Sequence, residues 1–196
     1  MSSPAAQRNR FEERKQAKRR RTLITWGVVA LAVLALAAYL TWTAIRPAEG
    51  VAIPTAEAVH IPEGEDPGEF NSNPPTSGSH YDIPLPGGFY EESDLEQFGP
   101  YPLGYAMHSL EHGYIIFWYN CDLLSPSECE ALKAELREYV EGSLNSKLIV
   151  YPWQDTDVPL VLSSWGYMLE MPEFNARQAS AFINTNRLRA PEPNAP

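Results

Sequence analysis

The run YIIFWY at residues 114–119 decides the fold, because it contains six successive apolar or aromatic residues that favour β-structure. Strands that face solvent on one side alternate polar with apolar residues, and this run does not alternate. An unbroken run is typical of a strand that is covered on both faces. The sequence therefore predicts the central strand of a sheet at these residues.

A helix is expected a few residues beyond this strand. Ser125 has the properties of an N-cap, Pro126 suits the first helical position, and Glu128 completes a capping box with Ser125. The helix is predicted to run to about Glu141 and to end at Gly142. Its buried stripe consists of residues at helical spacing, namely Cys129, Leu132, Leu136, Tyr139 and Val140.

Three more elements are predicted in the C-terminal half. Residues 147–151 and 160–165 have the composition of strands, and a last helix over about residues 173–188 packs its apolar face inward. The order strand, helix, strand, strand, helix predicts a small α+β fold, in which two helices pack on a mixed sheet. The first two strands are expected to be parallel and joined by a right-handed crossover.

The region before the central strand is expected to consist of ordered loops. Nine prolines lie between Pro54 and Pro102, and they exclude long helices and central strands. A disordered segment is the alternative interpretation, but six aromatic residues give this region material to pack against a core. They are Phe70, Tyr81, Phe89, Tyr90, Phe98 and Tyr101.

The N-terminal quarter of the chain is predicted to cross a membrane. Residues 1–21 carry eight Lys or Arg against two Glu, and residues 23–45 contain no charged side chain. An apolar stretch of this length spans the hydrocarbon core, roughly 30 Å thick, as a helix. A cleaved signal peptide is the alternative, since Ala35-Leu36-Ala37 resembles a small-residue cleavage site.

These patterns divide the chain into five parts and predict its location. The basic block places the N-terminus in the cytoplasm by the positive-inside rule, so we expect a single-pass protein of the cell membrane with an extracytoplasmic domain. The parts are a basic cytoplasmic tail at 1–21, a transmembrane helix at 22–45, a linker at 46–55, the exterior α+β domain at 56–190 and a flexible tail at 191–196.

The charge of the exterior part excludes one class of partner. From Thr41 onward the chain has 23 Asp or Glu and seven Lys or Arg, a balance of −16. Such a surface repels nucleic acid. The basic N-terminal block is explained by topology and by attraction to anionic lipids. The expected partners are therefore the membrane and a membrane protein complex.

Cys121 and Cys129 are the two cysteines of the chain, and both lie on the side predicted to be outside the cytoplasm. An oxidising compartment permits a disulfide between them. A catalytic or metal-binding thiol pair is the alternative, but seven intervening residues fit no common redox motif. The sequence therefore favours a structural disulfide.

All four histidines fall in one stretch of the chain, and two of them belong to the run HSLEHG at residues 108–113. Imidazole is a common metal ligand and proton carrier near neutral pH. His108 and His112 are four residues apart, so they share one face of the short helix that Gly104 and Gly113 delimit. The two side chains can then bind a single ion.

His80 is a third candidate ligand. It ends the segment NPPTSGSH at residues 73–80, where rigid prolines and a glycine can place one imidazole accurately. Three histidines from two segments would complete a copper or zinc site with an open fourth position. His60 is then a fourth ligand or a partner that orients one. Taken singly, each histidine is explained as well by backbone hydrogen bonds in an ordered loop.

Glu111 lies inside the histidine run and has two candidate roles. The segment HSLEH matches the inverted zinc-protease pattern, in which Glu111 would be the catalytic base for a metal-bound water. Those proteases need a long helix and a further carboxylate on a second helix, for which this chain has little room. In the alternative role, Glu111 orients a ligand or balances charge beside the metal.

Three motifs together resemble the bacterial domain-of-unknown-function family 3105. They are PPTSGSH at residues 74–80, HSLEHG at 108–113 and SWG at 164–166, and the likeness extends from about His60 to the last helix. Ser79 stands where the family pattern has proline, which implies a looser loop. The resemblance also implies a membrane-anchored or secreted envelope protein with a shared site, formed by His80, His108, Glu111, His112 and Trp165.

The sequence is compatible with three functions. The first is a single-pass membrane protein whose exterior domain binds copper or zinc through His60, His80, His108 and His112. The second is a non-catalytic accessory or scaffold subunit, in which these residues form a buried hydrogen-bond network that braces the proline-rich region against the sheet. The third is a metal-dependent hydrolase of the cell envelope with Glu111 as its base.

Overall fold

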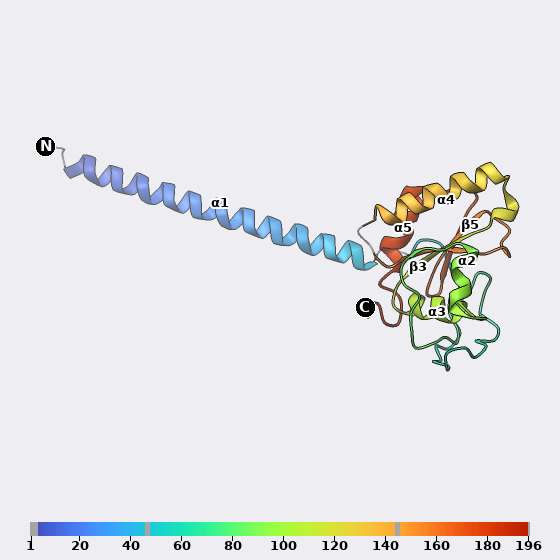
Figure 1. Ribbon diagram of the computed structural model, residues 1–196. Helices are drawn as coiled ribbons and strands as arrows, with labels where there is room; N and C mark the ends of the chain where they lie inside the picture. The colour runs from blue at the N-terminus through green and yellow to red at the C-terminus, as the bar shows by residue number, and fades with distance from the viewer. Residues whose placement is uncertain (1–3, 46–47, 144–145, 196) are drawn as a thin grey trace. The chain divides into compact units, whose positions relative to one another are not determined.

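The computed structural model describes residues 4–45, 48–143 and 146–195, and the chain divides into two compact units, residues 1–46 and 47–196. The first unit contains the helix α1 (Pro4–Ile45) (Figure 1). Within α1, the stretch Lys18–Trp42 is long and apolar enough to cross a membrane, and none of it is buried. Membrane anchors and signal sequences share this length and composition.

The central strand of the second unit is β3 (Ile115–Tyr119), as predicted. It is parallel to β4 (Leu148–Pro152) and antiparallel to β5 (Leu160–Ser164), so the sheet is mixed. The predicted parallel pairing of the first two strands is therefore confirmed. The six-stranded sheet has the order β1-β6-β5-β3-β4-β2, and its remaining strands are β1 (Val51–Ala52), β2 (Gly88–Phe89) and β6 (Tyr167–Met171).

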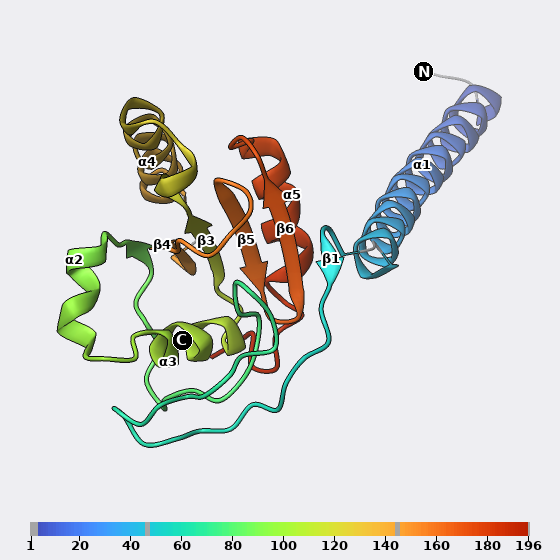
Figure 2. The ribbon, with the colours of Figure 1, turned by 90° about the vertical axis from the view of Figure 1, so that its right-hand side faces the viewer.

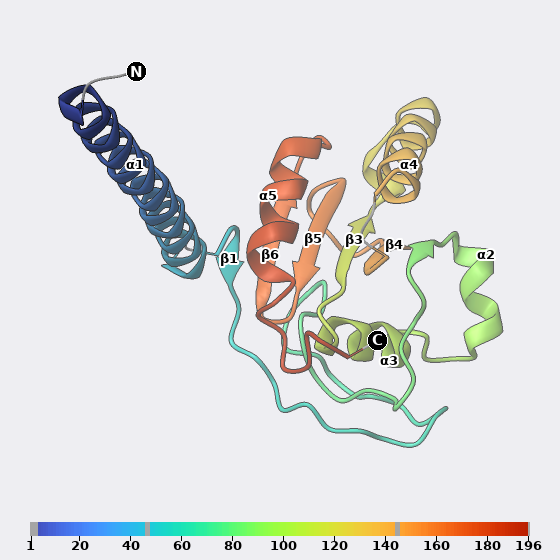
Figure 3. The ribbon, with the colours of Figure 1, turned by 90° about the vertical axis from the view of Figure 1, so that its left-hand side faces the viewer.

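The helices of the second unit are more numerous than predicted, since the sequence indicates two packed helices and the short helix at the histidine run. The described residues form α2 (Glu92–Leu95), α3 (Leu103–Glu111), α4 (Pro126–Glu141) and α5 (Ala176–Asn186), with two 3₁₀ turns, η1 (Glu96–Phe98) and η2 (Cys121–Leu123). The helices α4 and α5 lie on one side of the sheet and α3 lies on the other (Figures 2 and 3). The fold is therefore α+β with both sheet faces covered.

Side chains of β3 alternate between these two layers. Ile115 and Phe117 belong to the core that α4 and α5 cover, whereas Ile116 and Trp118 belong to the core that α3 covers. All four are fully buried. This two-sided burial explains why the strand has no polar residue.

The helix α4 begins as predicted. The hydroxyl of Ser125 accepts a hydrogen bond from the backbone N–H of Glu128, and the Glu128 carboxylate accepts one from the Ser125 N–H at 2.9 Å. Cys129 of this helix forms a disulfide with Cys121, and their Cα atoms are 5.2 Å apart. The disulfide joins the residues after β3 to α4, and it agrees with a secreted or membrane-anchored protein outside the cytoplasm.

The last part of the sheet contains a strand that the sequence analysis missed. The third predicted strand ends one residue early, the chain turns at Gly166 with φ +70°, and β6 returns antiparallel to β5. One of the five β6 residues is fully buried, so β6 is neither an apolar run nor a clear alternation. The last helix is also shorter than expected, 176–186 instead of 173–188, and it starts later because the side chain of Asn175 caps its N-terminus.

The proline-rich region is ordered and runs along α3. Tyr81 and Leu85 are at most 1% exposed. The backbone N–H of Tyr81 donates to the Gly104 carbonyl at 3.2 Å, and that of Leu85 donates to the Tyr105 carbonyl at 3.0 Å. A Cβ atom on Gly104 would lie 2.6 Å from the Tyr81 ring, so this close packing requires glycine.

The predicted linker and tail both contain hydrogen-bonded residues. Residues 46–47 of the predicted linker 46–55 lie outside the described residues, and residues 51–52 form β1. In the predicted tail 191–196, the backbone N–H of Glu192 donates to the Glu111 carbonyl at 3.0 Å. Residue 196 lies outside the described residues. The segment near residue 192 therefore packs directly behind the end of α3.

Candidate metal centre

The helix α3 brings two polar side chains to one place. His108 and Glu111 are three residues apart, so they project from the same side of the helix. They are 4% and 6% exposed. The helix ends directly after them, where Gly113 adopts φ +81° and any side chain would overlap the Arg187 carbonyl. The position of this helix end is therefore fixed by close packing.

The loop that precedes α3 holds His80. The side-chain oxygen of Asn71 accepts hydrogen bonds from the backbone N–H groups of Thr76 at 3.2 Å and Ser77 at 2.9 Å. His80 is fully buried, and its backbone N–H donates to the Val59 carbonyl at 2.9 Å. The loop conformation and this backbone contact together fix the position of the imidazole.

Backbone pairing places His60 beside His80, although twenty residues separate them. The two residues form a parallel β-bridge, and the N–H of Ile61 donates to the His80 carbonyl at 2.8 Å. The centroids of the two imidazole rings are 4.7 Å apart. Two segments of the proline-rich region thus bring one histidine each to the end of α3.

Four polar side chains converge at this point. One ligand atom from each of His60, His80, His108 and Glu111 lies within 4.8 Å of the other three, so the group could hold a metal ion. The Glu111 Oε2 atom lies 2.9 Å from His80 Nε2, 3.5 Å from His60 Nε2 and 3.9 Å from His108 Nδ1. The distance between His60 Nε2 and His108 Nδ1 is 3.2 Å. We call these four residues the His/Glu cluster.

The hydrogen bonds of His80 indicate that its contact with Glu111 requires a proton or a cation. Its Nδ1 atom lies 2.8 Å from the Gly78 carbonyl, which can only accept, so Nδ1 carries a proton. In the neutral ring, Nε2 then presents a lone pair to the Glu111 carboxylate at 2.9 Å. A lone pair and an ionised carboxylate repel each other at this distance. A proton or a metal ion must therefore compensate the contact.

The environment of His108 keeps its imidazole neutral near pH 7. Burial is the main cause that lowers the pKa of His108 to about 4, because it disfavours the charged ring. The histidines at 112, 80 and 60 act in the same direction, and Glu111 opposes them. A histidine must be neutral to bind a metal. His108 therefore has its lone pair available for a ligand bond.

Three side chains of the cluster are buried, and the fourth is in contact with solvent. The side chains of His80, His108 and Glu111 are 0%, 6% and 8% exposed, whereas His60 is 48% exposed. His60 therefore forms the solvent-facing side of the cluster.

Trp165 packs against the buried side of the cluster. Its ring lies at right angles to that of His80, with the centroids 6.2 Å apart, and it is 8% exposed. The backbone N–H of the next residue, Gly166, donates to the Thr76 carbonyl at 3.2 Å. The turn between β5 and β6 thus supports the loop that carries His80.

His112, which the sequence predicts as a metal ligand, is not one of the four converging residues. It is the C-cap of α3, and its ring lies against that of His108 at a centroid distance of 4.3 Å, with the two planes tilted by 58°. Its Nε2 atom lies 3.6 Å from the Glu192 carboxylate. The structure thus places His112 behind His108, and it places Glu111, predicted as a base or supporting residue, among the histidines.

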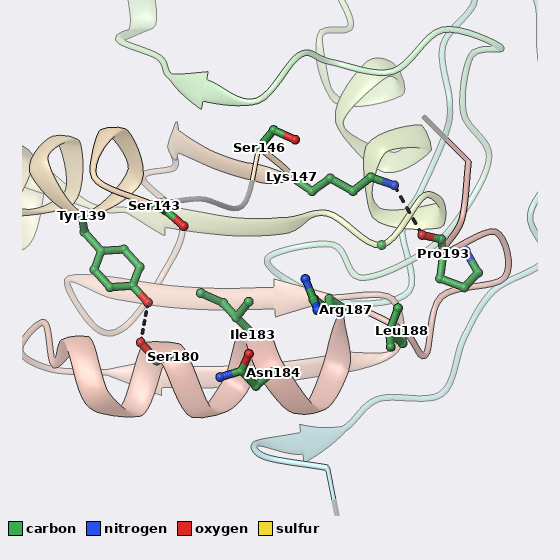
Figure 4. A pocket seen from close by; sticks show the side chains of 11 residues that line it. Tyr139, Ser143, Ser146, Lys147, Ser180, Ile183, Asn184, Arg187, Leu188 and Pro193 are labelled. Carbon is green, nitrogen blue, oxygen red and sulfur yellow. Dashed lines mark hydrogen bonds between the residues drawn. The ribbon is translucent and has the colours of Figure 1, made fainter. Parts of the chain in front are cut away.

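A separate hollow of about 460 Å³ lies between α4, α5 and the start of β4. In Figure 4, Tyr139 and Ser180 share a hydrogen bond on one side of it, and Lys147 reaches the carbonyl of Pro193 on the other. None of the cluster residues lines this hollow. The cluster is therefore a site of its own.

Comparisons with known proteins agree with the motifs in the sequence. The family described as Protein of unknown function (DUF3105) matches residues 63–196. The matched range contains His80, His108 and Glu111, and it begins three residues after His60. Neither the curated proteins nor the solved structures contain a match to this chain. Because the matched range covers more than half of its residues, the chain belongs to the DUF3105 family of proteins of unknown function.

Proposed function

We propose that the second unit binds one copper or zinc ion through His60, His80, His108 and Glu111. The spacing of the ligand atoms carries this proposal. Ligand atoms about 2.0–2.1 Å from a tetrahedral metal lie roughly 3.3–3.4 Å apart. Four of the six separations in the cluster are 2.9, 3.2, 3.5 and 3.9 Å, which lie on both sides of that value, and all the ligand atoms lie within 4.8 Å of one another. One ion placed between the four atoms would need only small side-chain movements.

The chemistry of the residues supports the same proposal. Three imidazoles and one carboxylate are ligands that suit zinc and divalent copper. A metal ion would also compensate the contact between His80 Nε2 and the Glu111 carboxylate. The hydrogen bond from His80 Nδ1 to the Gly78 carbonyl would orient the ring for binding, as second partners of metal-bound histidines commonly do.

A metal-free accessory subunit is the second candidate, and the contact between His80 and Glu111 favours it as well. A proton on the pair would make it a buried, charge-assisted hydrogen bond at 2.9 Å. The cluster would then brace the proline-rich region against α3, as in a scaffold subunit of a membrane protein complex. The hydrolase is less well supported, because Glu111 Oε2 faces three imidazoles as a ligand would and not as a free base.

The proposed topology is a single-pass anchor with a cytoplasmic N-terminus. The basic residues before the apolar stretch of α1 support this orientation. The disulfide between Cys121 and Cys129 supports an oxidising environment for the second unit. The metal centre would then lie outside the cytoplasm.

Elemental mass spectrometry of the purified full chain tests the proposed function. We expect close to one copper or zinc per chain after expression with both metals in the medium. A His80→Gln/His108→Gln variant should contain less than a tenth of that amount while it retains its disulfide and its circular dichroism spectrum. An unmodified chain without metal, at full structural integrity, would instead favour the metal-free accessory subunit.

A further inference from the structure

A single exposed carboxylate stands at the open side of the His/Glu cluster. The Oδ1 atom of Asp82 lies 4.0 Å from His60 Nε2, and the Asp82 side chain is 84% exposed. No other carboxylate of the described residues makes an ion pair with His60 except Glu111, which is buried. Asp82 and His60 therefore face each other where solvent meets the cluster.

The backbone around Asp82 is held firmly in place. Its neighbour Tyr81 is 1% exposed, and the Tyr81 N–H donates to the Gly104 carbonyl at 3.2 Å. The Tyr81 hydroxyl donates to the Glu65 carbonyl at 2.8 Å. These contacts hold the backbone directly before Asp82, and the exposed Asp82 side chain reaches to 4.0 Å from His60 Nε2.

Acidic residues also lie on the segment that follows His60 in the sequence. Glu63 follows His60 by three residues, and its carboxylate accepts a hydrogen bond from the Tyr105 hydroxyl, which holds it near the cluster side of α3. This hydrogen bond is the main cause that raises the pKa of Tyr105 to about 12, with burial next. Asp66 and Glu63 also contribute, after burial, to the raised pKa of Tyr81. The exposed carboxylate beside His60 is that of Asp82, and the negative charge of the residues that follow His60 in the sequence favours the approach of a cation to this segment.

We infer that Asp82 is the residue that captures the metal ion and passes it through His60 to the buried ligands. This inference rests on the proposed function. A hydrated divalent cation would exchange one water for the Asp82 carboxylate and a second for the His60 imidazole. The ion would then release the Asp82 carboxylate and its remaining waters as His80, His108 and Glu111 bind it, and a proton shared by His80 and Glu111 would pass to solvent. Both steps exchange ligands only, so no electron is transferred and the metal keeps its oxidation state.

Asp82 is thus distinguished from a ligand of the bound state. Because it leaves the metal before the final complex forms, its removal should slow uptake and release by the same factor. The equilibrium dissociation constant should change little. Loss of a true ligand would instead weaken equilibrium binding, since the final complex would lack one bond.

Stopped-flow measurements of zinc uptake by the full chain in detergent test this inference. For uptake, the protein is mixed with zinc bound to a coloured chelator, and the colour change reports the transfer of zinc to the protein. For release, the zinc-loaded protein is mixed with an excess of the metal-free chelator. The Asp82→Asn variant removes the carboxylate with little change in volume. The control is Asp157→Asn, which removes an equal charge from another exposed aspartate.

We expect Asp82→Asn to slow uptake at least about tenfold, within the range of electrostatic capture effects. Release should slow by a similar factor, the dissociation constant should stay within about twofold, and Asp157→Asn should behave as the unmodified chain.

Equal slowing in both variants would overturn the inference, because bulk charge would explain it. A tenfold weaker dissociation constant in Asp82→Asn would also overturn it, because Asp82 would then be a ligand. An unmodified chain that binds neither zinc nor copper would refute the proposed function itself, and this result comes from the metal content and not from the rates.

Discussion

Zinc at a thousand times its dissociation constant is expected to raise the free energy of unfolding of the second unit by about 4 kcal/mol. The reason is that His60, His80, His108 and Glu111 come together only in the folded chain. The unfolded chain offers no comparable site, so the free energy of zinc binding stabilises the folded state only. Urea unfolding of the full chain, followed by near-ultraviolet circular dichroism with and without zinc, measures this gain.

Single histidine variants show which side chains provide the gain. His80→Ala should remove most of it, because the fully buried His80 has the shortest contact with Glu111. His60→Ala should remove a large part, and His112→Ala should retain most of it, because His112 packs behind His108 and is not one of the cluster residues. The reverse order, with the gain lost in His112→Ala and kept in His60→Ala, would contradict the ligand set proposed above.

Trp118→Ala is expected to lower the free energy of unfolding by about 3–5 kcal/mol, as large-to-small substitutions of buried aromatic residues do. The Trp118 ring is fully buried and lies 5.1 Å from that of Tyr151 and 5.5 Å from that of Trp153, between centroids. Its indole N–H donates to the Ser163 hydroxyl at 2.7 Å, across to β5. The truncation therefore leaves a cavity at the centre of the sheet and an unpaired hydroxyl.

The matched variant for this experiment is Trp118→Phe. It keeps an aromatic ring in the α3 core and removes the hydrogen bond to Ser163, so its effect should be clearly smaller than that of Trp118→Ala. Urea unfolding followed by circular dichroism gives both values. If Trp118→Ala costs less than about 1 kcal/mol, the central role assigned to β3 is wrong.

Strong local patterns made most of the fold predictable. The apolar run at 114–119 contains the central strand, because a two-sided core tolerates no polar residue there. The capping box of Ser125 and Glu128 marks the start of α4, because it pairs backbone groups that the first helical turn leaves unpaired. Weak patterns explain the omissions. The strands β1 and β2 have two residues each, and β6 is mostly half-buried, so none of them shows a period.

The cluster was only partly predictable because part of it depends on long-range pairing. The parallel bridge that joins His60 and His80 is a backbone contact between distant segments, and no spacing in the sequence reveals it. The spacing of His108 and His112 suggested a shared ligand face. His112 is instead the C-cap, with ψ near 8°, where the chain leaves the helix. Glu111 stays within the helix three residues after His108, which the i, i+3 rule could have indicated. Asp82 carries no motif of its own.

X-ray absorption spectroscopy of the zinc-loaded full chain tests the central claim most directly, because it reports the atoms bonded to the metal. We predict four nitrogen or oxygen neighbours at about 2.0–2.1 Å, with the outer-shell scattering of three imidazoles. The His60→Ala variant should lose one imidazole and His112→Ala none. A shell made of water oxygens alone, or an unchanged imidazole count in His60→Ala, would contradict the proposed metal centre.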